Sequence, residues 1–455
     1  SWVQKKIARR EISVPPAFSS QIHPLLQRIY AARGVDRDEG IDRVMSRLLP
    51  PSMLKGIDAA VDLLVHALQS DENILIVGDF DADGATSCAL AVLALRALGA
   101  RRVDYLVPNR FRYGYGLTPE IVAVAHERAP DLLVTVDNGI SSVEGVAAAR
   151  SLGIKVLVTD HHLPGPQLPD ANAIVNPNQP GCEFPSKNLA GVGVIFYVMS
   201  ALRSRLRTLG WFAEQGLAEP NMADFLDIVA VGTVADVVPL DANNRVLVHH
   251  GLQRIRAGRC RPGIRALAEV ANRKLERLVA ADLGFAVGPR LNAAGRLDDM
   301  SHGIECLLVQ DETSARALAQ ELDQLNVDRR AIENSMQQEA MAALKQLSLD
   351  VSRLPYGLCL YKQDWHQGVI GILAARVKER YNRPVIAFAK GDNGELKGSA
   401  RSVAGVHIRD VLDAVASRHP GLITKFGGHA MAAGLSLPPE NYTAFRDAFD
   451  IEVRR

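Results

Sequence analysis

The chain has 455 residues, of which 47% are hydrophobic and 23% charged, and its 52 Lys and Arg side chains nearly balance 51 Asp and Glu side chains. This composition is typical of a globular protein with about two or three domains, and it excludes a disordered, collagen-like or disulfide-stapled chain. Because the charge is balanced, any site for a polyanion must be local.

No apolar run approaches the ~20 residues that span a bilayer, and the basic residues 1–10 lack the apolar segment of a signal peptide. The five cysteines are scattered without a CxxC pair, which argues against a disulfide framework and a zinc knuckle. We therefore expect a cytoplasmic protein with reduced thiols and no contact with membranes.

After an N-terminal segment (1–56), amphipathic stretches alternate with short β-branched stretches, which predicts βαβ units and a parallel sheet. Further on, residues 311–347 contain neither Gly nor Pro, which predicts a long connecting helix. The expected helices cover 57–69, 85–98, 119–127, 143–152, 190–206 and 222–235, and the expected strands cover 73–77, 103–107, 132–136 and 155–159.

A second α/β pattern follows, with strands expected at 356–361 and 384–389 and helices at 370–381 and 442–450. The predicted fold class is therefore α/β, with a parallel-sheet domain joined by a long helix to a smaller α/β domain. The expected boundaries are 57–310 for the first domain, 311–350 for the connecting helix and 351–455 for the second domain.

Three carboxylates follow the first expected strand within five residues, at Asp79, Asp81 and Asp83. Carboxylates this close repel one another and have raised pKa values unless a cation lies among them, which makes a hard divalent metal the natural partner. The alternative is a helix N-cap with exposed acidic side chains, which explains one of the aspartates well and three poorly.

Polar residues also follow the third and fourth expected strands, 132–136 and 155–159. Asp137 begins an Asp-Asn-Gly sequence, which alone is a common turn, and Asp160 precedes His161 and His162, of which a single His is usually structural. Because ligands bind outside the carboxyl ends of the strands in an open parallel sheet, we expect these clusters to share one edge.

Asp236 interrupts the apolar run 231–239, where an unpaired charge would be costly. Aspartates and a histidine that converge from four segments predict a binuclear metal site. Oxygen ligands suit Mg²⁺ and Mn²⁺, imidazole favours Mn²⁺, and the absence of a nearby thiolate disfavours zinc. We therefore expect two divalent metal ions, Mn²⁺ or Mg²⁺.

The acidic clusters, together with 288–296, 365–371 and 427–434, resemble the ordered motifs of the DHH phosphoesterase superfamily, and more narrowly its bacterial 5′ to 3′ exonucleases specific for single-stranded DNA. The resemblance implies a DHH domain, a connecting helix and a DHH-associated domain that closes over the substrate. Relatives often carry a metal-binding His at the position of Val77, so Asp79 takes over that role or the ligand is missing. Those exonucleases also continue into an OB-fold domain beyond the position of Arg455, so we expect weak binding with a short footprint.

The resemblance implies two metal ions that activate water and stabilise the attacking and leaving oxygens of a phosphodiester. Asp137 is expected to bridge the ions, while Asp160 and His162 orient the ligands. The expected metal ligands are Asp79, Asp81, Asp83, Asp137, His161 and Asp236, and the expected catalytic residues are Asp137, Asp160, His161 and His162.

Substrate contacts are expected in further segments. In residues 110–116, cationic and aromatic side chains alternate. Such aromatic rings can stack on bases, which predicts a contact with DNA. A solvated turn is an equally good interpretation of the same residues. The glycine turn at 427–429 offers backbone N–H groups to a phosphate, and Arg296 offers a guanidinium in a loop. Residues 254–277 predict an exposed, arginine-rich helical face. The expected substrate-binding residues are Arg110, Arg112, Tyr113, Tyr115, Asn292, Arg296, His366, Arg401, Ser402, Gly427, Gly428 and His429.

The implied function is metal-dependent 5′ to 3′ degradation of single-stranded DNA to 5′-mononucleotides in DNA repair and recombination. A helicase and a single-stranded-DNA-binding protein are the expected partners. One alternative is a DHH phosphodiesterase for short oligonucleotides or cyclic dinucleotides. The other is a non-catalytic, DNA-binding replication scaffold, which the intact acidic clusters disfavour.

Overall fold

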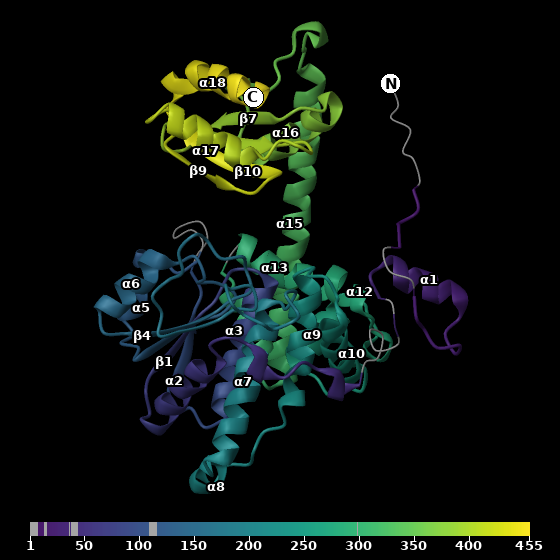
Figure 1. The fold of residues 1–455 in the computed structure, drawn as a ribbon, viewed down its shortest axis with the longest axis vertical. Helices are drawn as coiled ribbons and strands as arrows, with labels where there is room; N and C mark the ends of the chain where they lie inside the picture. The colour runs from purple at the N-terminus through teal and green to yellow at the C-terminus, as the bar shows by residue number, and fades with distance from the viewer. Residues whose placement is uncertain (1–7, 13–15, 36, 38–43, 109–115, 298) are drawn as a thin grey trace. The chain divides into compact units, whose positions relative to one another are not determined.

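The computed structural model describes residues 8–12, 16–35, 37, 44–108, 116–297 and 299–455. The chain divides into two compact units between Val327 and Asp328, within one long helix (Figure 1). This helix, α15 (Glu312–Gln346), has 35 residues and confirms the long helix predicted from the sequence. No helix in the described ranges is long and apolar enough to cross a membrane.

The first unit contains a five-stranded sheet in the order β2-β1-β3-β4-β5, and every strand pair is parallel, as predicted. The register aligns Val77 with Thr135, and Thr135 with Val158. The strands are β1 (Ile74–Val77), β2 (Val103–Leu106), β3 (Leu132–Thr135), β4 (Lys155–Thr159) and β5 (Ala173–Val175).

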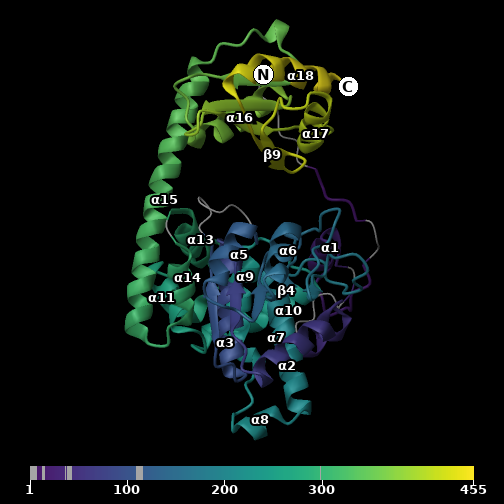
Figure 2. The same cartoon turned by 90° about the vertical axis from the view of Figure 1, so that its left-hand side faces the viewer.

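Helices cover both faces of this sheet. Leu75 and Val77 of β1 pack with α5 and α6 on one face (Figure 2), whereas Ile74 and Ile76 point to the opposite face, which carries α2, α3 and α7. Alternation along a strand explains this division, and burial on both faces explains why the inner strand β1 is continuously apolar. These helices are α2 (Ile57–Gln69), α3 (Ala82–Ala97), α5 (Pro119–His126), α6 (Val143–Ser151) and α7 (Gly191–Thr208).

The rest of the first unit is helical. Residues 288–297, expected to form a loop, are the helix α13, which continues from a π-helical turn at η6. The longer elements are α1 (Pro24–Ala32), α8 (Trp211–Gln215), α9 (Leu226–Ala235), α10 (Ala242–Arg256), α11 (Pro262–Val270), α12 (Ala280–Asp282), η6 (Leu283–Val287), α13 (Gly288–Leu297) and α14 (Ser301–Leu308). The short 3₁₀ turns are η2 (Met45–Arg47), η3 (Pro51–Met53), η4 (Met222–Phe225) and η5 (Leu275–Arg277).

The second unit contains a mixed sheet in the order β6-β7-β8-β10-β9. Helix α16 packs on one face of it and helices α17 and α18 on the other. Its elements are η7 (Val351–Arg353), β6 (Leu358–Tyr361), α16 (Gln367–Tyr381), β7 (Val385–Lys390), β8 (Leu396–Arg401), α17 (Ile408–Arg418), β9 (Lys425–Gly428), β10 (Ala432–Leu437), η8 (Pro439–Asn441) and α18 (Tyr442–Arg454).

The sequence reading missed three strands of this second sheet, β8 to β10. It took Gly427 and Gly428 for a glycine turn, whereas both residues belong to β9 and pair with Gly434 and Ala433 of β10. Strand β9 is an edge strand, because only β10 pairs with it. The glycines therefore leave a stretch of sheet without side chains rather than a loop.

Candidate metal centre

The register of the first sheet places three aspartates at equivalent positions. Asp79, Asp137 and Asp160 each lie two residues beyond one of the aligned positions Val77, Thr135 and Val158. All three are at most 5% exposed. The sheet therefore brings the clusters to one edge, as the sequence predicted.

Asp137 has the environment expected of a metal ligand. Its backbone is left-handed, with φ of 59°, a conformation that Asp tolerates better than most residues. The side chain is fully buried, and neither carboxylate oxygen has a hydrogen-bond partner among the described residues. Because a buried carboxylate without a partner is costly, this side chain fits a metal ligand.

His161 completes this arrangement. Its Nε2 lies 2.9 Å from Oδ1 of Asp137, 3.5 Å from Oδ2 of Asp83 and 3.6 Å from Oδ2 of Asp236. This Nε2 atom nevertheless has no hydrogen-bond partner in the described part of the chain. Four potential ligand atoms thus converge on one small volume, which is the donor set expected around a divalent ion.

The convergent side chains form overlapping groups whose ligand atoms lie within 4.8 Å of one another. Asp137 occurs in two of these groups, and His161 also occurs in two. The groups are Asp79, Asp81 and Asp137; Asp83, His161 and Asp236; and Asp137, Asp160, His161 and His162. All six expected metal ligands therefore occur in these groups, and Asp137 is common to two of them.

The loop that carries the first three aspartates is fixed by backbone hydrogen bonds. Asp81 caps α3 by accepting from the N–H of Gly84 at 2.7 Å, so one aspartate does serve as an N-cap. Asp83 accepts from the N–H groups of Gly191 and Val192, at 2.7 and 2.9 Å, in the first turn of α7. Its position therefore depends on that helix.

Gly191 was not predicted as part of the site. A Cβ atom at this position would lie 2.7 Å from Cβ and from Oδ1 of Asp137, closer than real Cβ contacts. Only glycine therefore allows the start of α7 to lie against the central carboxylate. The sequence signal was the pair Gly191 and Gly193 at the start of an otherwise apolar helix.

Burial and mutual repulsion raise the pKa values of these acids, as the sequence predicted for closely spaced carboxylates. Burial, together with the charge of Asp81, raises the pKa of Asp79 to about 8. Burial, together with the charge of Asp83, raises the pKa of Asp236 to about 8. The pKa of Asp137 is raised well above its usual range by burial and by Asp83. A bound cation would relieve all three.

Asp160 and His162 form a separate pair. Nδ1 of His162 lies 2.6 Å from Oδ1 of Asp160. Burial opposes the charge of both residues, but the hydrogen bond and charge of His162 outweigh it and lower the pKa of Asp160, while Asp160 raises the pKa of His162 to about 9. Asp160 also accepts from the N–H groups of Ile140 and His161, so it orders the loops on both sides.

Two residues expected to bind substrate occupy α13. Asn292 does not face a substrate loop: its Oδ1 accepts from the backbone N–H of Ala82 at 2.8 Å, inside the acidic loop. Arg296 lies one turn further along α13 and is exposed. Asn292 therefore positions the acidic loop, and its contact with substrate stays a prediction.

In the second unit, a cavity of about 380 Å³ lies beside the sheet, and Lys397, Ser399, Lys425 and Gly427 line it. This arrangement offers cations and unobstructed backbone to a phosphate. His429 is exposed just beyond β9, next to Gly428.

The other candidates of this unit differ in placement. Ser402 is fully buried and its hydroxyl donates to the carbonyl of Val406 at 2.6 Å, which contradicts a substrate contact. Arg401 lies over α16, with its guanidinium 3.1 Å from where a Cβ of Gly371 would be. His366 contacts Glu339 through Nε2. Arg110, Arg112, Tyr113 and Tyr115 lie outside the described residues.

The fold and the site define a class: an α/β protein whose parallel sheet presents a cluster of acidic and histidine ligands at the carboxyl ends of its strands. Residues 73–233 match the DHH family, N-terminal domain, and residues 351–454 match the DHHA1 domain. The chain is 60% identical over 441 residues to the single-stranded-DNA-specific exonuclease RecJ of Dickeya dadantii, covering 97% of this chain and 77% of that protein. It is 57% identical over 446 residues to RecJ of Escherichia coli, covering 98% of this chain and 77% of that protein. The chain belongs to the RecJ family.

Solved structures agree. A crystal structure of exonuclease RecJ bound to manganese has a TM-score of 0.72 at 36% identity, covering 90% of this chain and 96% of that one. RecJ of Thermus thermophilus in complex with Mn²⁺ has a TM-score of 0.72 at 35% identity, covering 94% of this chain and 58% of that one. The resemblance read from the sequence motifs is therefore confirmed.

Proposed function

We propose that this chain is a metal-dependent exonuclease that degrades single-stranded DNA in the 5′ to 3′ direction and releases 5′-mononucleotides, in DNA repair and recombination. The single observation that carries the proposal is the buried set of ligand atoms on Asp137 and His161, which lack hydrogen-bond partners among the described residues. The relatives named as single-stranded-DNA-specific exonucleases support the choice of substrate.

We propose that two divalent ions, Mn²⁺ or Mg²⁺, occupy the site. Asp79, Asp81 and Asp137 would hold one ion, and Asp83, His161 and Asp236 the other, with Asp137 shared between them. Such ions supply Lewis acidity, which activates water and stabilises the charge that develops on a phosphodiester. Related RecJ structures in complex with Mn²⁺ and with Mg²⁺ support this assignment.

The chain's own residues prepare the site for the reaction. Asp83 and Asp81 fix the acidic loop through the backbone N–H groups of α7 and α3. Asp160 holds His162 in its charged form, because the pKa of His162 lies near 9. The His162 side chain is 43% exposed, so its imidazolium is available to a phosphate oxygen of the substrate.

The second unit would hold the DNA backbone. A phosphate group could contact the cations of Lys397 and Lys425 and the backbone at Gly427, where no side chain blocks access. Ser399 adds a hydroxyl donor. A contact with the terminal phosphate would set the 5′ to 3′ direction, because each cut leaves a new 5′-phosphate on the strand. We assign Arg401 and His429 of the second unit to the binding of this phosphate, and Arg296 of the first unit separately to substrate binding.

We further propose a cytoplasmic location, which all five cysteines support because each is a free thiol. An exonuclease for single strands needs duplex DNA to be opened first. A helicase that exposes strands and a single-stranded-DNA-binding protein that protects them are therefore the proposed partners.

The proposal is tested by a time course with Mn²⁺ on a 3′-labelled single-stranded oligonucleotide, beside its blunt duplex. We expect labelled products that shorten progressively toward the 3′ end on the single strand alone, and no products with Asp137→Ala or His161→Ala. Release of labelled mononucleotide at the outset would show that the chain degrades DNA in the 3′ to 5′ direction instead. Hydrolysis of dinucleotides alone would identify a phosphodiesterase for short substrates, and binding without any hydrolysis would identify a scaffold.

A further inference from the structure

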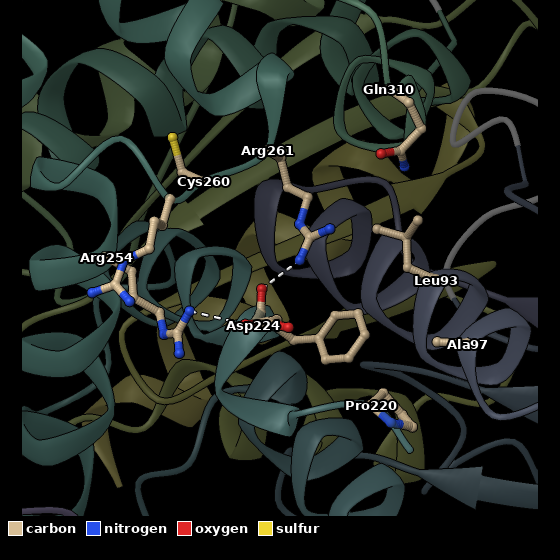
Figure 3. A pocket seen from close by; sticks show the side chains of 10 residues that line it. Leu93, Ala97, Pro220, Asp224, Arg254, Cys260, Arg261 and Gln310 are labelled. Atoms are coloured by element: carbon tan, nitrogen blue, oxygen red, sulfur yellow. Dashed lines mark hydrogen bonds and ion pairs between the residues drawn. The ribbon is translucent and has the colours of Figure 1, made fainter. Parts of the chain in front are cut away.

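A cavity of about 540 Å³ lies in the first unit, and none of its lining residues belongs to the metal centre (Figure 3). Two helices join the two places. Helix α3 carries Asp83 in its first turn and Leu93 and Ala97 of the cavity near its end, so the sites are about 15 to 20 Å apart along its axis. Helix α9 begins directly after Phe225 of the cavity and ends directly before Asp236.

One side of this cavity is basic. Arg254, Arg259 and Arg261 line it, against the carboxylate of Asp224 and that of the buried Asp227, whose Oδ2 lies 3.5 Å from Nε of Arg261. Nη1 of Arg254 lies 2.9 Å from Oδ1 of Asp224. This hydrogen bond uses one N–H donor of the Arg254 guanidinium and not its other donors. The side chain of Arg259 is exposed and makes no hydrogen bond or ion pair with the described residues. The cavity therefore keeps a net positive charge.

Arg261 forms the centre of the cavity (Figure 3). Its guanidinium lies over the ring of Phe225, 5.3 Å from the ring centroid, and donates to the backbone carbonyl of Asp224. Beneath it, the fully buried Asp227 accepts from the backbone N–H of Arg261 at 2.7 Å. Arg261 is thus held in place as a planar cation, a surface that aromatic bases stack on.

The other side is apolar and ends in an amide. Figure 3 shows Leu93, Ala97 and Gln310 on the opposite side of Arg261 from Arg254 and Cys260. Leu93 and Ala97 offer a flat aliphatic wall, and the exposed Gln310 offers both a donor and an acceptor. Such a wall with one amide suits a heteroaromatic base, whose faces are apolar and whose edge is polar.

We propose that this cavity is a binding site for a nucleoside monophosphate, separate from the metal centre. The phosphate would lie against Arg254 and Arg259, because guanidinium groups match phosphate oxygens in pairs. The base would lie between Arg261 and the wall of Leu93 and Ala97, within reach of Gln310. A volume of about 540 Å³ lies within the range of small-molecule sites.

The proposal is tested by calorimetric titration of the full chain in EDTA, which removes any contribution of bound metal. The probes are thymidine 5′-monophosphate, thymidine and inorganic phosphate. We expect one site per chain for the monophosphate, at least tenfold weaker binding of thymidine and of phosphate, and about tenfold weaker binding of the monophosphate to Arg259→Ala. Arg277→Ala is the matched control, because it removes an exposed arginine of the same stretch that does not line the cavity.

Three results would overturn the proposal. Equal binding of thymidine and its monophosphate would show that the arginines do not bind phosphate. The nucleotide would lie in the second unit if two results were found together. The monophosphate would still bind to Arg259→Ala and to the double variant with Arg254→Ala and Arg259→Ala, and it would no longer bind to His429→Ala. Binding of a single-stranded oligonucleotide that depends on Arg259, without any binding of the monophosphate, would assign the cavity to the DNA backbone. The test is independent of the exonuclease proposal, since no turnover is measured.

Discussion

Oδ1 of Asn292 accepts a hydrogen bond from the backbone N–H of Ala82 at 2.8 Å, across 210 positions of the sequence. Ala82 lies between Asp81 and Asp83, so this bond holds the middle of the acidic loop. Gly295 packs one turn further along α13, where a Cβ atom would lie 2.0 Å from the carbonyl oxygen of Phe80. Helix α13 therefore positions the metal ligands without contributing one.

We expect Asn292→Ala to weaken Mn²⁺ binding about tenfold, because outer contacts of this kind typically change metal affinity by about 10- to 100-fold. Calorimetric titration with Mn²⁺ measures the change directly. Asn393→Ala, in an exposed turn of the second unit, is the matched control and should bind Mn²⁺ like the unaltered chain. An unchanged affinity in Asn292→Ala would mean that α13 does not set the loop.

The raised pKa values of the buried acids make the metal-free chain sensitive to pH. The pKa values of Asp79 and Asp236 lie near 8 in the folded chain, against 3.8 for an ordinary aspartate. Between these values the folded state binds more protons than the unfolded state, so stability is greatest below the lower value and falls as the pH rises toward 8. In EDTA we expect the melting temperature to fall by several degrees from pH 5.5 to 8.5.

Saturating Mn²⁺ should remove this fall, since metal binding favours the deprotonated carboxylates. Asp137→Asn should flatten the pH profile in EDTA, because it removes the most deeply buried of the repelling acids. Thermal melts at several pH values with and without Mn²⁺ make the comparison. A metal-free chain that gains stability toward pH 8.5 would contradict the assigned protonation.

Gly191 gives a steric test of the same centre. We expect Gly191→Ala to lower metal affinity and cleavage by at least tenfold, because the new Cβ would push against the carboxylate of Asp137. Gly193→Ala lies two residues further along α7 and would approach only the end of the flexible Leu189 side chain, at 3.1 Å. It should bind Mn²⁺ normally. Mn²⁺ titration of both variants gives the answer, and equal loss in both would point to helix α7 as a whole.

Ser399 and Ser402 separate substrate binding from structure in the second unit. Ser399→Ala should raise KM for a single-stranded oligonucleotide a few-fold with little change in melting temperature, because Ser399 lines the cavity beside Gly427. Ser402→Ala should instead lower the melting temperature, since it removes the hydrogen bond from the buried Ser402 hydroxyl to the carbonyl of Val406. Steady-state kinetics and thermal melts on both variants are required. The reverse pattern would restore Ser402 as the substrate contact.

The convergence of the acidic clusters was predictable because it follows from local sequence pattern and sheet topology. Strand periodicity located Val77, Thr135 and Val158, and a parallel sheet then had to bring Asp79, Asp137 and Asp160 to one edge. No information on distant contacts was needed.

The errors arose where glycine serves packing rather than turning. Gly288 and Gly295 suggested a loop, but they lie in α13 because the helix packs closely on Ala235 and on Phe80. Gly427 and Gly428 suggested a turn, although they belong to an edge strand, where only Gly428 is closely packed. Asn292 and Gly191 could not be assigned from the sequence, since each acts through a contact far along the chain.

The burial of Asp137 among other carboxylates also has a consequence for the chain before it binds any substrate. A newly made molecule without metal must bury mutually repelling acids, so it opens more often and exposes its interior to proteases. Metal that binds only the folded form stabilises it, and this stabilisation increases with the concentration of free metal. The supply of divalent metal would then govern how long each molecule persists, and with it how much of the protein is present.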